Sequence, residues 1–240
     1  MSRYFDTIGV IGGMGSYSTL YFFKKFLELF NVEEEYERPR IIIDNYCTLP
    51  NKVKAYLYGE SKEELLSQII VSLQELKKMG CTKSLILCNT THAFVEEILD
   101  REVELRGYLL DMMDCLSQKL YQDGVKRALV WATRNTIKTG IFEKYLHRWG
   151  IDVEYDINHN EDAVHMLMLS GEKNLFSKQV ESQYNQLCKM YDGAIPVVLG
   201  CTELSVVHGT FKGGNSLTIY DPIECVLENI FKNLHRRCRQ

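Results

Sequence analysis

Several features that would assign this chain to a specialised class of protein are missing. It has only four prolines in 240 residues and no low-complexity linker, so we expect its parts to pack closely rather than hang on a tether. No stretch approaches the ~20 apolar residues of a membrane span. Residues 1–6 lack the apolar run and the small-residue cleavage site of a signal peptide. We therefore expect a cytoplasmic protein with no membrane partner.

An excess of positive charge is also missing. The formal net charge is −4, which leaves no basic footprint, so nucleic acid is not expected as a partner. The eight cysteines show no disulfide framework and no Cys-x-x-Cys pair, and Cys88-x-x-x-His92 stands alone. A cytosolic chain of this length keeps its thiols reduced and does not need disulfides for stability. We expect neither disulfides nor a metal site.

Apolar runs alternate with longer amphipathic stretches, which predicts βαβ units and mainly parallel sheets. The apolar and charged fractions, 45% and 25%, are ordinary for a globular chain of one large or two small domains. Strands are expected at 7–11, 41–44, 84–87, 108–111, 127–132, 151–155, 195–199 and 217–220. Helices are expected at 16–30, 61–79, from about 91, at 114–122, after 133–136 to 149, at 161–169 and 173–191, and from 222. Residues 49–52 are expected to form a loop, and Ser61 with Glu64 a capping box.

Two cysteines occupy matching places in the two halves of the chain. Cys88 follows the apolar run 84–87 and Cys201 follows 195–199, so the two are 113 positions apart, close to half of 240. This pattern predicts an α/β fold of two pseudo-symmetric lobes, 1–110 and 111–221, with the site in the cleft between them. It allows the C-terminal helix, about 222–240, to pack back on the first lobe.

The placement of these thiols favours chemistry over packing. The carboxyl ends of parallel strands line the ligand crevice of open α/β sheets, and a following helix N-terminus lowers a thiol pKa. A single cysteine at a strand end is more often a buried small hydrophobic residue, but two in symmetric contexts favour function. Two thiols on opposite faces of a carbon can remove a proton from one side and return one from the other. The other six cysteines are interpreted as structural.

The neighbours of the two thiols are small and polar. Asn89, Thr90 and Thr202 suit an α-carboxylate and an ammonium group. His92, four residues after Cys88, would share its face on a helix and could orient or deprotonate that thiol, or be an internally satisfied histidine. Glu203 either shapes the environment of Cys201 or places negative charge at a helix start.

A glycine turn follows the first strand, at Gly12-Gly13-Met14-Gly15. No Lys-Ser/Thr follows and the third Rossmann glycine is absent, which argues against a nucleotide site. Two interpretations remain open: a tight strand-to-helix turn, or a nest of backbone amides that holds a carboxylate.

Together these motifs resemble the aspartate/glutamate racemase superfamily, and within it the amino-acid (aspartate) racemase branch. The resemblance rests on the glycine turn, Cys88-Asn89-Thr90-x-His92, Gly200-Cys201-Thr202-Glu203-Leu204, Ala132-Thr133-x-x-Thr136-x-x-x-Gly140 and Asp221-Pro222. It implies racemisation of aspartate, glutamate or a related amino acid without pyridoxal phosphate or metal, commonly by a homodimer. One thiolate takes the Cα proton and the opposite thiol delivers another.

The resemblance also implies how the substrate is held. The backbone amides of Met14, Asn89 and Thr202, with the hydroxyls of Thr90 and Thr133, would stabilise an enediolate-like carboxylate.

The chain departs from that branch at two places. The arginine implied to bind the distal carboxylate is missing from the stretch 50–56, where Lys52 or Lys54 would replace it. The helix before Gly171 lacks the branch's lysine. The acidic side-chain preference is therefore open. Two other classes stay open as well: a maleate-isomerase-like enzyme whose first cysteine adds to a dicarboxylate, and a non-catalytic small-molecule-binding homologue.

Overall fold

The computed structural model describes residues 6–155, 161–191, 193, 195–212 and 217–237. The first half runs β1 (Ile8–Gly12), α1 (Ser16–Leu29), η1 (Glu35–Glu37), β2 (Ile41–Asn45), α2 (Lys52–Tyr58), α3 (Lys62–Lys78), β3 (Lys83–Ile86), η2 (Thr90–Phe94), α4 (Val95–Arg101) and η3 (Val103–Leu105). The second runs α5 (Met112–Gln122), β4 (Arg127–Trp131), α6 (Arg134–Ile137), α7 (Ile141–Leu146), η4 (His147–Trp149), β5 (Asp152–Glu154), α8 (Glu161–Lys173), α9 (Lys178–Met190), β6 (Val197–Leu199), α10 (Thr202–Phe211), β7 (Ile219–Tyr220) and α11 (Pro222–Arg237).

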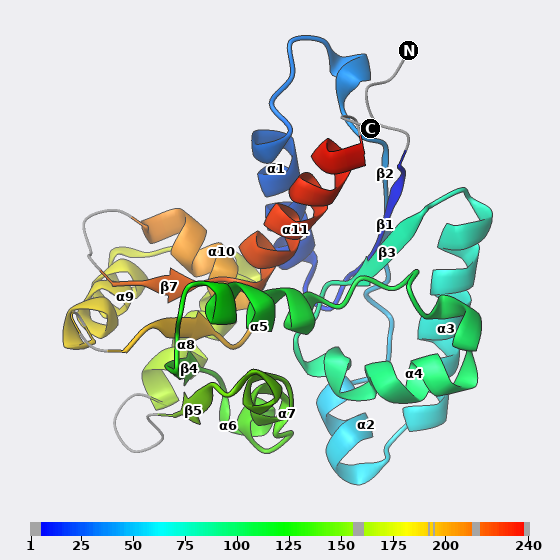
Figure 1. Ribbon diagram of the computed structural model, residues 1–240. Coiled ribbons are helices and arrows are strands. Elements are labelled where there is room, and N and C mark those ends of the chain that lie inside the picture. The colour runs from blue at the N-terminus through cyan, green and yellow to red at the C-terminus, as the bar shows by residue number, and fades with distance from the viewer. Residues whose placement is uncertain (1–5, 156–160, 192, 194, 213–216, 238–240) are drawn as a thin grey trace.

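These strands form two parallel sheets, one in each half of the chain. Their orders are β2-β1-β3 and β5-β4-β6-β7, so in each sheet the first strand of the half lies between the second and the third. Every strand pair in the described residues is parallel. Figure 1 shows the two sheets side by side as separate lobes. The expected α/β fold of two similar lobes is confirmed.

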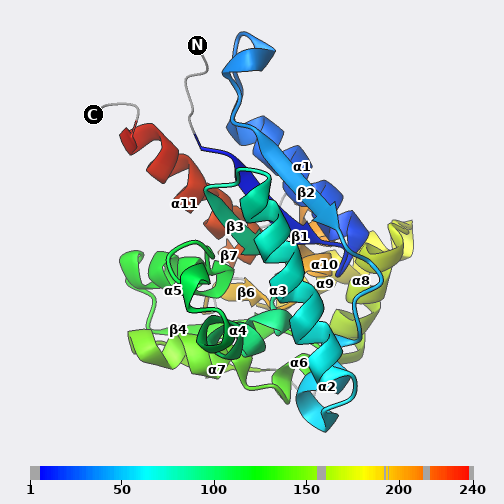
Figure 2. The same ribbon diagram turned by 90° about the vertical axis from the view of Figure 1, so that its right-hand side faces the viewer.

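Helices cover both faces of the first sheet because its central strand alternates sides. Ile8 and Val10 of β1 pack with Phe22 and Phe26 of α1, whereas Ile11 packs with the apolar stripe of α3. Figure 2 shows α3 in front of this sheet and α1 behind it. A strand that is buried on both faces has a continuous apolar run in its sequence, and such a run predicted this strand.

The second sheet is covered in the same way. Ala128 and Val130 of β4 pack with α7, while Leu129 and Trp131 pack with α8, α9 and α10. Side chains alternate along this strand as they do along β1, so successive residues point to opposite faces of the sheet.

The second half opens with α5 and ends with α11, and these two helices pack against each other between the lobes (Figure 1). Met113 and Leu116 of α5 belong to the core of the second lobe, but Met112 belongs to that of the first. Ile223 and Val226 of α11 belong to the same core cluster as residues of β1 and α1. The boundary at 110/111 stays a prediction.

Two expectations about strands and caps were wrong. Residues 108–111 form one parallel bridge, Leu109 with Ser84, rather than a strand, because Gly107 turns the chain at φ 73° and Asp111 already caps α5. Ser61 forms no capping box, since it lies at φ 51° and its side chain makes no cap hydrogen bond.

Two expected boundaries were also wrong. The loop expected at 49–52 ends at Asn51, and residues 52–58, for which no helix was predicted, form α2, because the side chain of Asn51 accepts hydrogen bonds from the amides of Val53 and Lys54. The helix expected from 173 begins at Lys178, capped by Ser177, while α8 continues to Lys173. No helix in the described residues is long and apolar enough to cross a membrane.

Candidate active site

A cavity of about 490 Å³ opens between the lobes, where the carboxyl ends of β3, β4 and β6 meet the turn after β1. Nine of the ten predicted site residues line it: Met14, Lys52, Cys88, Asn89, Thr90, Thr133, Cys201, Thr202 and Glu203. The first five come from the first lobe and the other four from the second. The tertiary fold therefore brings together the two cysteine motifs that lie far apart in the sequence.

Both thiols are buried in this cavity. Cys88 is 3% exposed and lies two residues after β3, while Cys201 is 9% exposed and is the N-cap residue of α10. The hydroxyl of Thr136 lies 3.8 Å from the sulfur of Cys201.

Cys201 is held as a neutral thiol. Burial and then the charge of Glu203 raise its pKa to about 12, and hydrogen bonds from the backbone of Thr133 and the hydroxyl of Thr136 only partly oppose this. The helix N-terminus was expected to lower the pKa of this thiol. Here desolvation outweighs that effect, since it disfavours the charged form.

Asn89 connects the two lobes. Its Nδ2 donates to the backbone oxygen of Leu199 at 3.3 Å. Its Oδ1 is buried and has no hydrogen-bond partner among the described residues. A buried, unpaired amide oxygen beside two thiols is an acceptor for a ligand N–H group.

The structure distinguishes between the two lysines proposed from sequence. Lys54 lies on the surface beside Glu60, but Lys52 reaches the cavity, where its Nζ donates to the backbone oxygen of Met14 at 3.2 Å. Burial lowers the pKa of Lys52, but its electrostatic interactions with the acidic groups of Cys88, Glu203, Cys201 and Glu172 together outweigh burial and raise that pKa. Lys52 is therefore a fixed cation in the site.

Glu203 is the main acidic neighbour of this lysine and of Cys201. Burial raises the pKa of its carboxyl, and the positive charge of Lys52 opposes that rise. The hydroxyl of Thr202 donates to Glu203 Oε2 at 3.4 Å. Glu203 therefore fits both interpretations: it affects the pKa of the Cys201 thiol, and it places an acidic group in the first turn of α10.

His92 does not line the cavity. Its Nδ1 lies 2.8 Å from the backbone oxygen of Cys88, and its Nε2 accepts the amide N–H of Met112 at 3.2 Å. Both ring nitrogens therefore have backbone partners, so His92 fixes the loop that carries Cys88 instead of deprotonating the thiol.

Sequence reasoning missed a whole wall of the cavity. The residues not singled out are Asn51, Val53, Arg134, Asn135, Asp162, His165, Met168 and Glu172. Thr136 was noted only as part of a motif. Four of the missed residues lie on one face of α8, and their helical spacing was the available signal.

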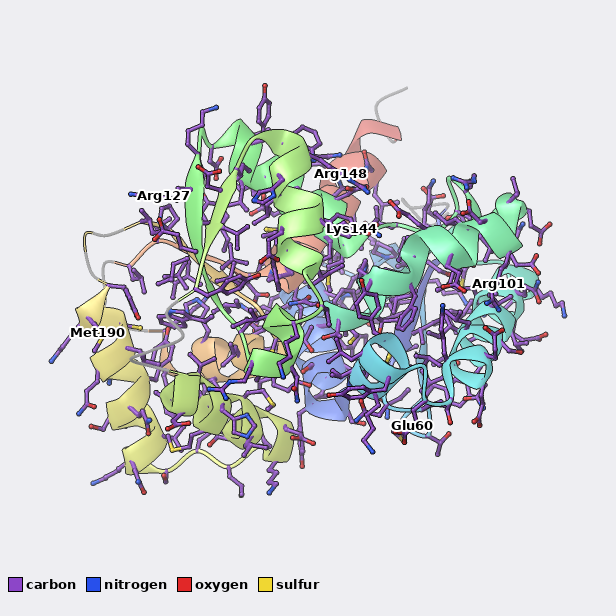
Figure 3. The ribbon with its side chains drawn as sticks, turned by 90° about the horizontal axis from the view of Figure 1, so that it is seen from below. Glu60, Arg101, Arg127, Lys144, Arg148 and Met190 are labelled. Carbon is purple, nitrogen blue, oxygen red and sulfur yellow. The ribbon has the colours of Figure 1, made fainter. Side chains whose placement is uncertain are left out.

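Ion pairs reinforce the contact between the lobes. Glu96 of α4 forms ion pairs with two residues of the second lobe, Lys144 at 2.8 Å and Arg148 at 2.5 Å. Figure 3 shows Lys144 and Arg148 between the lobes. Arg127 and Met190 lie on the outer side of the second lobe, and Arg101 lies on the first lobe (Figure 3). Among the described residues, no group of three or more His, Cys, Asp or Glu side chains could hold a metal ion.

Comparisons with known proteins agree with this geometry. A family model described as Asp/Glu/Hydantoin racemase matches residues 11–230. The broad specificity amino-acid racemase RacX of Bacillus subtilis (strain 168) is 24% identical over 92% of this chain and 95% of its own.

Solved structures share the fold. The aspartate racemase of Picrophilus torridus superposes with a TM-score of 0.78 at 21% identity, covering 98% of each chain. The glutamate racemase of Francisella tularensis, solved with D-glutamate, superposes with a TM-score of 0.64 at 19% identity over 97% of this chain and 82% of its own.

Proposed function

The chain belongs to the Asp/Glu/Hydantoin racemase family, and we propose that it inverts the Cα centre of an amino acid by proton transfer between Cys88 and Cys201. The observation that carries this proposal is that two thiols from equivalent strand ends of two lobes line one cavity. No organic cofactor is needed for such a step, since each sulfur acts as base in one direction and as acid in the other.

The protonation states follow from the environment of the two sulfurs. A two-base inversion needs one thiolate and one thiol at the start of each turnover. Because burial and Glu203 keep Cys201 protonated, Cys201 donates to Cα in the direction in which Cys88, as thiolate, removes the proton. In the reverse direction the two roles exchange.

The polar residues around the thiols supply the binding and the stabilisation of charge. Asn89 Oδ1, buried without a partner among the described residues, accepts a hydrogen bond from the substrate ammonium. The fixed charge of Lys52 and the first turn of α10 at Thr202 face the α-carboxylate. Charge develops on that carboxylate when Cα loses its proton, so these preorganised groups lower the barrier.

The experiment that tests this function is proton NMR of the enzyme with single amino acids in heavy water. The expected result is loss of the Cα proton signal, without added cofactor, together with the opposite enantiomer on chiral analysis. Conversion of maleate to fumarate, with no exchange of any amino acid, would replace the proposal with a dicarboxylate isomerase. Ligand binding without any exchange would indicate a non-catalytic homologue.

The homodimer also remains a proposal. Light scattering coupled to size-exclusion chromatography measures it directly, and a mass of one chain at micromolar concentration would contradict it.

A further inference from the structure

The wall of the cavity formed by α8 is acidic, and this wall bears on which amino acid fits. Asp162, His165, Met168 and Glu172 all line the cavity from one face of the helix. Asp162 and Glu172 are exposed in the free protein. Neither forms an ion pair or a hydrogen bond within the part of the chain that the structure describes.

The cations of the cavity do not offset this wall. Lys52 already donates to Met14 and lies in the field of Glu203 and Glu172. Arg134 is the second cation in the lining of the cavity. Three carboxylates, including Glu203, therefore face two cations, and the thiolate of the working enzyme adds a further negative charge.

Under the proposed function, the reacting part of the substrate binds at the inner end of the cavity, beside the two thiols. Cα must lie between the two sulfurs, and the buried Asn89 Oδ1 marks a position for the ammonium group there. The side chain then extends toward the exposed part of the cavity, where α8 lies. A distal carboxylate would meet like charges at that place, whereas a distal cation would meet opposite ones.

We propose, on the basis of the proposed function, that the side-chain subsite is built for a cationic chain, ending in an ammonium or a guanidinium. Asp162 and Glu172 are its counter-charges, and Met168 lies along its methylene stem. The half-buried thioether suits this role because long cationic side chains place their stems on apolar surface and keep their charge in water. Lys52 then serves the α-carboxylate, not a distal one.

The test compares L-lysine, L-glutamate and L-norleucine by Cα exchange in heavy water. Norleucine has the length of lysine without its charge. The kcat/KM for lysine is expected to exceed that for glutamate by at least about tenfold, a difference of ~1.4 kcal/mol. Glu172→Gln and Asp162→Asn should each lower the ratio of lysine to norleucine by about three- to fivefold, as expected for partly exposed pairs. Glu181→Gln on the outer face of α9 is the matched control and should leave this ratio unchanged.

A gain of function gives a second readout. Met168→Lys places a cation on the same wall and should raise kcat/KM for glutamate relative to norleucine. Glutamate preferred over lysine in the wild-type enzyme, with ratios unchanged in E172Q and D162N, would overturn the inference while leaving the racemase intact. Absence of exchange with any of the three amino acids, or with a wider panel, would overturn the proposed function instead.

Discussion

The side-chain amide of Asn89 donates a hydrogen bond of 3.3 Å to the backbone oxygen of Leu199. Asn89 directly follows Cys88, and Leu199 ends β6 two residues before Cys201. One buried hydrogen bond thus joins the loop that carries the first thiol to the strand that leads to the second. This contact is one of those that hold the two thiol-bearing segments together across the cavity.

Asn89→Asp should therefore damage both the site and the fold. The carboxylate keeps an oxygen for the ammonium group but cannot donate to Leu199, and it places a buried charge beside a carbonyl. We expect a loss of about 1–3 kcal/mol in the free energy of unfolding and a large fall in racemisation. Urea denaturation and chiral assay measure the two effects. The exposed Asn233→Ala is the control, and wild-type behaviour of N89D would show that the bond has no such role.

Under the proposed mechanism, each of the two cavity thiols should be indispensable for inversion. Cys88→Ser and Cys201→Ser are expected to lower racemisation by roughly 10²–10⁴-fold, because the hydroxyl is a far weaker acid than the thiol. Polarimetry follows the loss. Cys47→Ser is the matched control, since Cys47 is exposed and does not line this cavity. Full activity in either active-site variant would rule out the two-thiol mechanism.

Glu203 should set the reactivity of Cys201 with alkylating agents. Its negative charge helps to raise the pKa of that thiol to about 12, so Glu203→Gln should lower the pKa and increase the thiolate fraction at any pH below it. Iodoacetamide labelling at about pH 9, read by mass spectrometry, should be several-fold faster at Cys201. Cys115, whose pKa burial also raises to about 12, is the internal control. Equal labelling of Cys201 in both proteins would contradict the electrostatic role.

Asp221 should make the stability of the fold depend on pH. Burial, and then the charge of Glu224, raise its pKa to about 7, and its Oδ2 has no partner among the described residues. Because the folded state holds this proton more tightly than the unfolded chain, stability falls as pH rises from about 4 to about 7.

Asn mimics the protonated form of this residue. Asp221→Asn should match the wild type near pH 4 and be more stable at about pH 8, by up to about 4 kcal/mol. Urea denaturation at both pH values tests this, with the exposed Asp100→Asn as the control. A stability difference that does not change with pH would show that Asp221 titrates normally.

Gly171 should be needed for the approach of α8 to α10. A Cβ at this position would lie 2.2 Å from the backbone oxygen of Glu203. Gly171→Ala therefore forces the two helices apart and should cost about 1–3 kcal/mol of stability, together with part of the activity. Thermal denaturation measures the cost. Ser170→Ala is the neighbouring control, and a G171A protein as stable and active as the wild type would show that the helices absorb the methyl group.

The fold class followed from local patterns, and so did nine of the residues that line the cavity. The apolar runs before Cys88 and Cys201 marked buried parallel strands, and the carboxyl ends of such strands point to one crevice wherever the lobes pack. The strand predicted at 108–111 was wrong because a short apolar run does not show whether its backbone pairs with a neighbouring strand. The turn at Gly107 and the cap formed by Asp111 prevent this segment from pairing as a full strand.

The residue types and the strand-end positions of Cys88 and Cys201 were thus set by the sequence, because both are local properties. Three things were decided only by the tertiary structure. Both nitrogens of His92 are bound by backbone groups of Cys88 and Met112; Lys52 rather than Lys54 reaches the cavity; and α8 contributes an acidic wall. Each of these depends on the angle at which a helix or loop meets the other lobe, and that angle is set by packing among residues far apart in the chain.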